Sequence, residues 1–383
     1  MSRPELRLVL LKCILLLALL VVPASAAAPP PASILDARIP ALMKREKVNG
    51  LALAVIDGGQ VRHLRAFGWR NVERRLPLTT DTVMYAASMT KAAFAYYVLT
   101  LVDQGLLDLD APLAKLLPQP LPAYEEYSAL DERWRLLTPR MLLNQSSGLA
   151  NFPQLEPDGK LRFHFDPGTR YAYSGAGINL LQFVIEKGLG LHVGAEMQRR
   201  VFEPLGMRRT SLSWREEFAD NLADGYSLDG KFEPHDRRDN VRAAGSMDTT
   251  IADQARLWSA VIRGDGLSER SRREFSRPQL PIASAHQFPP FSTEVGPDNA
   301  KIALAAGLGV VTFYDANGPT WFKGGHNDVT GNMVICQERQ RRCLVLLAND
   351  VRAELIYPEI AALVLGETRM PWRWDNDPMQ VAK

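Results

Sequence analysis

Residues 85–96, YAASMTKAAFAY, place one serine, Ser88, and one lysine, Lys91, three positions apart in an almost wholly apolar run. Positions three apart lie on one face of a helix, so Lys91 could take the proton of Ser88. Ser88 stands where this helix should begin, and the free N–H groups of a helix N-terminus favour negative charge. The spacing predicts a serine nucleophile with a lysine base, or, more simply, an N-capping serine followed by a solvated lysine.

A lysine base needs help from its surroundings. At its ordinary pKa of about 10.4, a lysine is a poor base at neutral pH, and burial or a second cation would lower that value. Lys323, in TWFKGGHNDVTGNMVI just ahead of a β-type run, is a candidate for the second cation. Gly324 and Gly325 would let a ligand approach the backbone closely. The simpler interpretation is a hairpin turn that carries a solvated lysine.

Tyr173 is a candidate proton donor or acceptor. It belongs to FDPGTRYAYSGAGINLLQ, in which a turn at Asp166-Pro167-Gly168 precedes Tyr173-Ser174-Gly175 and an apolar helix. A tyrosine in such a loop usually serves packing. Its phenol can also act as an acid or base if nearby cations depress its pKa.

Several other chemistries lack their motifs. The chain has no Gly-x-Ser-x-Gly, no Gly-rich phosphate loop ending in Lys-Ser/Thr, and no Gly-x-Gly-x-x-Gly after a strand. No HExxH-like pair occurs among the six histidines, which are His63, His164, His192, His235, His286 and His326. We therefore expect no metal and no cofactor.

The two ends of the chain should build one sheet. Two β-type runs flank Asp57-Gly58-Gly59, a strong hairpin signal, and helical spacing precedes them at residues 33–48. Strand-like runs return from residue 303, and a final helical run occupies residues 352–367. An α/β (α+β) fold follows, with an antiparallel sheet flanked by terminal helices.

The middle of the chain has a different character. Residues 106–280 are rich in Pro, Gly, Leu and helical periodicity, whereas residues 280–300 resemble a loop. We predict a sheet lobe from about 33–105 and 300–370, and a mostly helical insertion lobe over about 106–280. A cleft between the lobes is the expected place for a site.

Two cysteines flank a polar six-residue turn in VICQERQRRCLVL. The apolar β-formers on either side predict a hairpin, in which Cys336 and Cys343 could face each other. The sequence leaves a disulfide and two free thiols as equal alternatives. Zinc is improbable because no histidine pair lies nearby.

Residues 1–26 have the pattern of a cleaved signal peptide, with basic residues, an apolar run and Ala24-Ser25-Ala26. We therefore predict an exported protein, and no stable membrane span after cleavage. The alternative is an uncleaved membrane anchor. Residues 1–26 hold three of the 45 Lys and Arg and one of the 43 Asp and Glu, which leaves 42 of each. This balance provides no basic surface for nucleic acid.

The ordered set of these motifs resembles the serine β-lactamase and penicillin-binding-protein superfamily. Ser88-x-x-Lys91, Tyr173 and Lys323 occur in the family's order and at comparable spacing. The flanks are most similar to its branch of class C β-lactamases, D,D-carboxypeptidases and esterases. Supporting stretches are LLNQSSGL, FDPGT, VFEPLGMRRTSL and AAGSMDTTIADQARLW. The resemblance implies a β-lactamase/transpeptidase-like serine hydrolase domain over residues 27–383.

The resemblance also implies a role for each site residue. Ser88 would be the acylated nucleophile, Lys91 its base, and Tyr173 an acid/base toward the leaving group and the deacylating water. Lys323 would hold a substrate carboxylate. The backbone N–H groups of Ser88 and His326 would form the oxyanion hole, which an acyl transfer requires.

Two departures from the family pattern affect substrate choice. The family's Tyr-x-Asn ends here in Gly175, and its Lys-Thr-Gly is Lys323-Gly324-Gly325. Both changes weaken the case for an efficient β-lactamase. The expected substrate is a small molecule or peptide, namely an ester or a D-amino-acid peptide ahead of a β-lactam. The alternatives are a non-catalytic receptor for peptides or peptidoglycan fragments, and an acyl transferase. The oligomeric state stays open.

Overall fold

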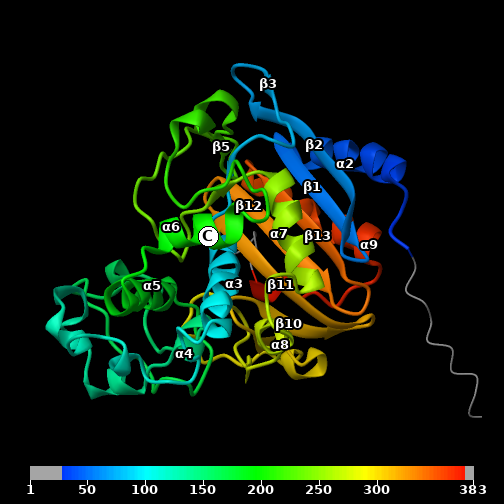
Figure 1. Cartoon of the computed structure of the whole chain (residues 1–383). Coiled ribbons are helices and arrows are strands. Elements are labelled where there is room, and N and C mark those ends of the chain that lie inside the picture. Colours follow the sequence, from blue (N-terminus) through cyan, green and yellow to red (C-terminus); the bar gives the residue numbers. More distant parts are fainter. Residues whose placement is uncertain (1–27, 376–383) are drawn as a thin grey trace, which may run out of the picture.

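The computed structural model describes residues 28–375, and its centre is an antiparallel sheet (Figure 1). The strand order is β3-β2-β1-β13-β12-β11-β10-β9-β8. The first three strands are β1 (Gly50–Asp57), β2 (Gln60–Asn71) and β3 (Leu76–Pro77). The others are β8 (Leu280–Pro281), β9 (Ala305–Ala306), β10 (Val311–Asp315), β11 (Gly318–Asn327), β12 (Thr330–Gln337) and β13 (Arg342–Ala348).

The two ends of the chain meet where β1 pairs with β13, as predicted. Leu53 lies opposite Leu346, and the neighbouring pairs are also apolar and fully buried. Successive side chains of a strand point to opposite faces. Because both faces of these central strands are covered, their sequences are continuous apolar runs rather than alternating ones.

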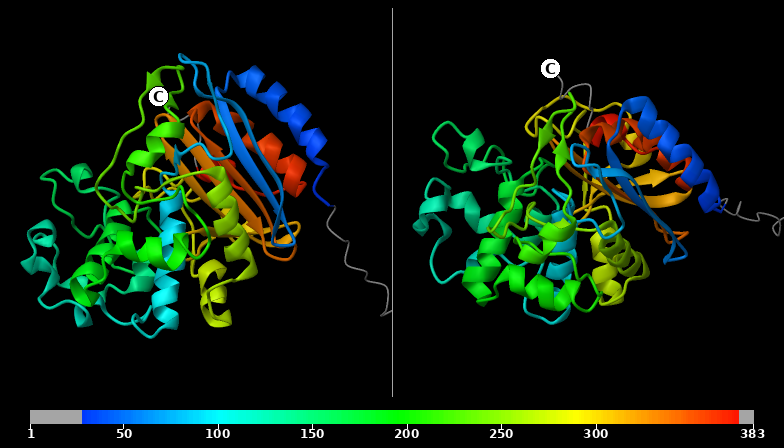
Figure 2. Two further views of the ribbon diagram at one scale, coloured as in Figure 1. Left: turned by 45° about the horizontal axis from the view of Figure 1, so that its top comes forward. Right: turned by 90° about the horizontal axis from the view of Figure 1, so that it is seen from above.

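Helices cover both faces of the sheet (Figure 2). The terminal helices α2 (Ala32–Glu46) and α9 (Tyr357–Leu365) pack on one face, in a cluster with Leu53. On the opposite face, α3 (Met89–Asp103) and α7 (Ile251–Arg263) share a second cluster with Ala54. The predicted fold class is confirmed.

Helix α7 differs from its predicted place. We assigned residues 106–280 to a helical lobe, but α7 contacts β1, β2 and β13. Its apolar side, which includes Leu257 and Trp258, completes the core of the sheet. The rest of the middle segment consists of α5 (Gly175–Leu189), short helices and 3-10 turns. The short helices are α4 (Pro139–Leu143), α6 (Val193–Met197) and α8 (Glu269–Ser276). Helices α4 and α6 contact α5, whereas α8 contacts α3. Two small ladders join β4 (Met84–Tyr85) to β7 (Asp248–Thr249), and β5 (Gly225–Tyr226) to β6 (Phe232–Glu233).

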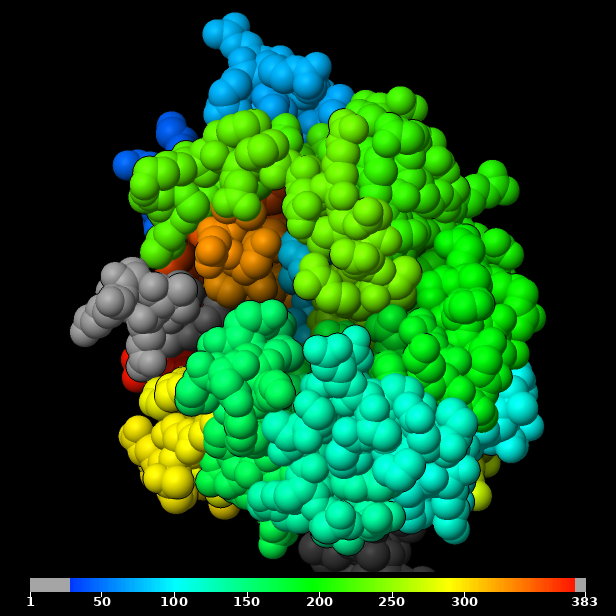
Figure 3. Space-filling model, turned by 90° about the vertical axis from the view of Figure 1, so that its left-hand side faces the viewer, coloured from blue at the N-terminus to red at the C-terminus, as the bar shows by residue number. Residues whose placement is uncertain are grey.

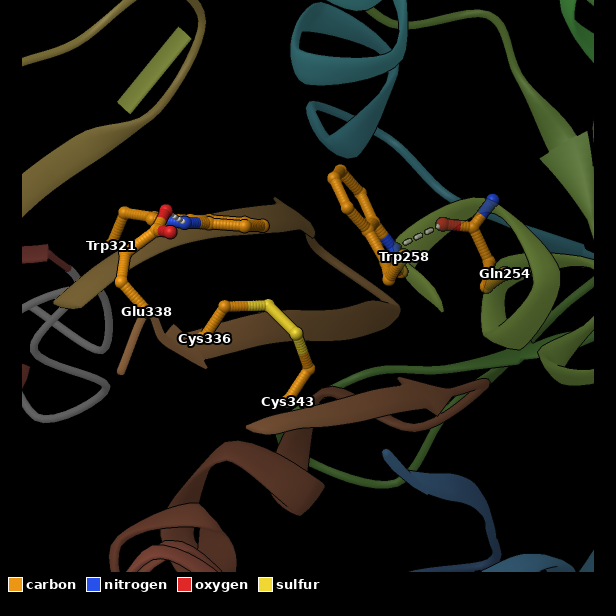
Figure 4. The surroundings of a disulfide bond; sticks show 6 residues. All are labelled: Gln254, Trp258, Trp321, Cys336, Glu338 and Cys343. Atoms are coloured by element: carbon orange, nitrogen blue, oxygen red, sulfur yellow. Dashed lines mark hydrogen bonds between the residues drawn. A yellow bond between two sulfur atoms is a disulfide. The ribbon is translucent and has the colours of Figure 1, made fainter. Parts of the chain in front are cut away.

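The cysteine hairpin forms as predicted, and its two cysteines make a disulfide. Cys336 lies opposite Cys343 in the β12–β13 ladder, and both are fully buried (Figure 4). The surrounding core includes Trp321 and Trp258, whose ring centres are 5.7 Å apart. Their indole N–H groups donate to Glu338 and to Gln254, respectively. The alternative of two free thiols does not match this structure.

The predicted signal peptide, residues 1–26, lies outside the described residues. Within residues 28–375, no helix combines the length and the apolar character that crossing a bilayer requires.

Candidate active site

Ser88 sits at the start of α3, as its sequence context predicted. The helix is buried on nearly all sides, which explains the apolar run around the serine and lysine. Ala87, directly before Ser88, has a φ of 48°. This left-handed conformation costs an alanine about 1 kcal/mol, and such residues concentrate at functional sites. The Ser88 hydroxyl caps no backbone N–H of α3, so the simple N-cap interpretation is wrong.

Two side chains instead donate to the Ser88 oxygen. Lys91 Nζ lies 2.9 Å from Ser88 Oγ, one helical turn further along α3. The Tyr173 hydroxyl donates to the same oxygen at 2.7 Å. Lys91 also donates to the carbonyl oxygen of Ala244 at 2.5 Å. These contacts bring residues 88, 91 and 173 together, in the grouping that the sequence predicted.

Burial sets the protonation of both partners of Ser88. Lys91 is 3% exposed, and this burial, reinforced by the positive charge of Lys323, lowers the pKa of Lys91 well below its ordinary value. Burial raises the pKa of Tyr173, while its hydrogen bond to Ser88 acts in the opposite direction. The ammonium groups of Lys91 and Lys323 lie 4.9 and 5.3 Å from the centre of the tyrosine ring. The phenol therefore starts as a proton donor, rather than with the depressed pKa that we considered from the sequence.

Lys323 and the two glycines after it lie inside β11, not in the turn that we considered. Lys323 Nζ donates to the carbonyl oxygen of Gly324 at 2.8 Å, and burial lowers the pKa of Lys323 to about 8. A Cβ on Gly325 would lie 2.3 Å from the carbonyl oxygen of Ala86 and 3.0 Å from the backbone nitrogen of Met89. Gly325 thus allows β11 to touch the turn that carries Ser88.

The surface is hollowed on the face that Figure 3 shows. In Figure 3, an orange segment of the C-terminal strands and a light-blue segment of the N-terminal part lie recessed between green segments of the middle of the chain. A ligand that enters there would meet material from both ends and from the middle of the chain. The position of the site between two lobes stays a prediction.

The family model for beta-lactamase matches residues 35–365. This chain belongs to the beta-lactamase family. The match covers α2 to α9, so it includes both lobes and every site residue named so far.

The relatives of this beta-lactamase-family chain act on varied substrates. It is 29% identical over 213 residues to a D-aminopeptidase of Gluconobacter oxydans, covering 52% of this chain and 40% of the relative. It is 29% identical over 274 residues to the lovastatin esterase of Penicillium rubens, covering 63% of each chain. The chain thus spans less than two thirds of the length of these relatives.

A solved structure supports the fold. The octameric penicillin-binding protein homologue from Pyrococcus abyssi superposes with a TM-score of 0.71 at 22% identity, over 90% of this chain and 79% of that one.

Gly175 stands where the family pattern has an asparagine, and it is the first residue of α5. The carboxamide of a different residue, Asn151, lies beside it. The backbone N–H of Gly175 donates to Asn151 Oδ1 at 2.8 Å. A Cβ on Gly175 would lie 3.0 Å from the same oxygen atom. In this beta-lactamase-family protein, Asn151 therefore occupies the space next to Gly175. The sequence carried no signal for this, because the two residues meet only through folding.

The side chain of His326 contacts an acid. Its Nδ1 lies 3.0 Å from Glu354 Oε1. Burial lowers the pKa of His326, but the contact with Glu354 and the charges of Asp375 and Asp328 together raise it above its ordinary value. The role expected for His326 involves its backbone N–H, whereas the contact with Glu354 involves its side chain. Sequence reasoning missed Asn151 and Glu354, and also Asp375 and Gln287, which lie near Lys323. Ala244 belongs to the AAGSMDTTIADQARLW stretch that resembled the family.

Proposed function

We propose that this protein is an exported serine hydrolase that forms an acyl-enzyme on Ser88. The observation that carries the proposal is the pair of hydrogen bonds at Ser88 Oγ, one from a buried lysine and one from a buried tyrosine. A lysine of lowered pKa and a tyrosine of raised pKa are matched to the roles of base and acid. A pure binding protein has no use for this arrangement.

The acylation step balances in protons. Neutral Lys91 takes the proton of Ser88 as the serine oxygen attacks the substrate carbonyl carbon. The backbone N–H groups of Ser88 and His326 stabilise the oxyanion; the contact between Gly325 and the Ser88 turn supports this role. Tyr173 gives its proton to the leaving group as the bond to that group breaks. The proton held by Lys91 then returns to the phenolate.

Water completes the cycle by deacylation. Tyr173 passes its proton to neutral Lys91 as it takes one from the attacking water, and Lys91 then gives this proton to the Ser88 oxygen as the acyl bond to that oxygen breaks. If another hydroxyl or amine takes the place of water, the same acyl-enzyme supports transfer instead. We favour an ester or a D-amino-acid peptide as substrate, because relatives are named as an esterase and a D-aminopeptidase. Gly175 also departs from the family pattern of β-lactamases.

Covalent labelling tests this proposal. Incubation with a fluorophosphonate should add one phosphonyl group to the mature protein by intact mass, and Ser88→Ala should abolish the adduct. Ser128→Ala, which changes an exposed serine of a 3-10 turn, should leave it intact. A fluorescent penicillin measured in parallel separates an esterase, labelled by the phosphonate alone, from an enzyme that also accepts β-lactams. The absence of both adducts would favour a non-catalytic receptor.

A further inference from the structure

Asp375 is a buried acid that the proposed mechanism does not use. It ends the short helix α10 (Trp372–Asp375) and is 8% exposed. Gln287 Nε2 donates to Asp375 Oδ1 at 3.2 Å and to its carbonyl oxygen at 3.0 Å. The other end of this carboxamide accepts from the Tyr171 hydroxyl at 2.8 Å. Asp375 is therefore held in place by hydrogen bonds that reach the loop of Tyr173.

This carboxylate lies against the strand that carries Lys323. Its Oδ2 is 2.9 Å from the position of a Cβ on Gly324, so the absence of a side chain there leaves room for it. Burial lowers the pKa of Lys323, and the negative charge of Asp375 acts in the opposite direction. Conversely, burial raises the pKa of Asp375, and the positive charge of Lys323 acts to lower it. Each group therefore partly offsets the charge of the other.

The other charged groups near Asp375 are also balanced. His326 contacts Glu354 at 3.0 Å, and both act on Asp375 electrostatically. Among residues 28–375, the charged groups that act on Asp375 are thus two basic side chains and one further acid. A substrate carboxylate placed beside Lys323 would add a further negative charge to a neighbourhood in which Asp375 already acts on this lysine. Like charges brought together in a buried setting oppose binding.

The rim of the site offers apolar surface instead. Phe288 follows Gln287, is 43% exposed, and has its ring centre 5.1 Å from that of Tyr173. Phe152, 50% exposed, lies 3.4 Å from the position of a Cβ on Gly175. These two rings flank the reacting groups and suit an uncharged, apolar substituent.

We propose that Asp375 is a specificity-determining residue, which neutralises Lys323 so that the site selects uncharged acyl esters over substrates that carry a carboxylate beside the scissile bond. This inference deepens the proposed function and rests on it. It accounts for Gly324, since a side chain at this position would collide with the carboxylate.

Two matched probes test the selectivity. Both are alkyl fluorophosphonates of equal length, one ending in a methyl group and the other in a carboxylate. We expect the methyl probe to label Ser88 of the wild type at least about tenfold faster than the carboxylate probe. Asp375→Asn should raise the carboxylate rate by about tenfold and leave the methyl rate within about threefold. Asp298→Asn, at an exposed acid paired with Lys301, should change neither rate.

A second measurement needs no variant. Burial raises the pKa of Asp375 to about 6, so its charge is lost as the pH falls through that value. The ratio of carboxylate to methyl labelling in the wild type should rise below about pH 6, and this rise should be absent in Asp375→Asn. Because the ratio cancels the titration of Lys91 and Tyr173, which both probes share, it reports on the Lys323 neighbourhood.

The outcomes separate the two proposals. Labelling of Ser88 at the same ratio in the wild type and Asp375→Asn, with a wild-type ratio that does not change with pH, overturns the role of Asp375 and leaves the serine hydrolase standing. A failure of both probes to label Ser88 overturns the hydrolase and the inference together. Thermal denaturation of Asp375→Asn checks that the variant is folded, and the wild-type pH series decides the matter if it is not.

Discussion

At the residue scale, the site depends on a lysine that must lose its proton inside the protein. Lys91 has two polar contacts, the hydroxyl of Ser88 and a backbone carbonyl, and neither carries a negative charge that would stabilise the ammonium. Burial is the main cause of its lowered pKa, and Lys323 adds to it. The same burial keeps the neighbouring phenol protonated. One apolar environment therefore favours both a neutral lysine and a protonated phenol, the states that the proposed base and acid require.

Removal of the base should slow acylation without preventing binding. Lys91→Ala should reduce the rate of phosphonylation of Ser88 by about 10²–10⁴-fold, the usual contribution of a general base. Stopped-flow or quenched labelling with intact mass gives this rate. Lys301→Ala, at an exposed lysine, is the matched control. A wild-type rate in the Lys91 variant would remove Lys91 from the mechanism.

The pH dependence of acylation should report the charge of Lys323. Acylation requires neutral Lys91, so its rate should rise as the pH increases through the pKa of this lysine. Lys323→Met removes a positive charge that lowers the pKa of Lys91, so the rising limb should move to higher pH. The pH at which the rate rises is measured from labelling by a methyl-ended fluorophosphonate between pH 5 and 10. If the rate rises at the same pH in the wild type and in Lys323→Met, the charge of Lys323 does not affect the pKa of Lys91.

At the scale of elements, the site is the contact between α3 and β11. Gly325 carries no side chain, and the backbone of β11 consequently reaches the turn that holds Ser88. Ala87 accepts a left-handed conformation in the same turn. The start of α3 and the C-terminal part of β11 are thereby brought into contact. Backbone N–H groups at this contact can point toward the carbonyl group of a substrate.

Gly325→Ala should separate these two elements. The added methyl would lie 2.3 Å from a backbone oxygen, so the turn or the strand must move. We expect acylation to fall by about 10²-fold or more, because small misplacements of reacting groups are costly. The free energy of unfolding should fall by about 1–3 kcal/mol. Gly190→Asn, at a left-handed helix end with nothing within 4 Å of the added Cβ, should leave acylation unchanged.

The disulfide should contribute to stability and not to chemistry. Cys336 and Cys343 join two strands that are already neighbours, deep in the sheet. Replacement of both by alanine should lower the free energy of unfolding by about 2–4 kcal/mol, as measured in urea. The rate of Ser88 labelling should stay within about twofold below the unfolding transition. Equal urea midpoints for the two proteins, or two reactive thiols in the denatured wild type, would contradict this prediction.

At the scale of the whole molecule, the reacting groups come from distant parts of one chain. Tyr173 is 85 residues from Ser88, and Ala244 is 153 residues from Lys91. The sheet that carries Lys323 also depends on strands that are distant in the chain, because β1 pairs with β13 at its centre. A site assembled in this way requires the whole domain to fold, and we expect activity and the cooperative unfolding transition to be lost together.

The predicted export depends on residues 1–26. Expression of the whole sequence in a bacterial host with a secretion pathway should yield a periplasmic or secreted protein that begins at Ala27, because residues 24–26 match a cleavage site. Mass spectrometry of the intact exported protein identifies this end. Retention of residues 1–26 in a membrane fraction would support the anchor that we considered instead.

The sequence by itself determined the local geometry of the site. A spacing of three residues on a helix places Lys91 beside Ser88 whatever surrounds them. The hairpins at Asp57-Gly58-Gly59 and between the two cysteines also follow from local turn chemistry and strand patterning. Such features depend on neighbours in the chain, so their physical causes can be read from composition and period.

Only the tertiary structure decided the electrostatics and the surroundings of the substrate. The position of Lys323 inside a strand, the raised pKa of Tyr173 and the packing of α7 on the sheet all differ from the simplest prediction. Nothing in the sequence indicated that Asp375 belongs to the site, because a single acidic residue near the end of a sequence is usually exposed to solvent. Desolvation and charge pairing depend on three-dimensional distance, and folding brings together groups that are hundreds of residues apart. The contact between Ser88 and Lys91 was therefore predictable from the sequence, whereas the surroundings of Lys323, to which we attribute the choice of substrate, arise only from the fold.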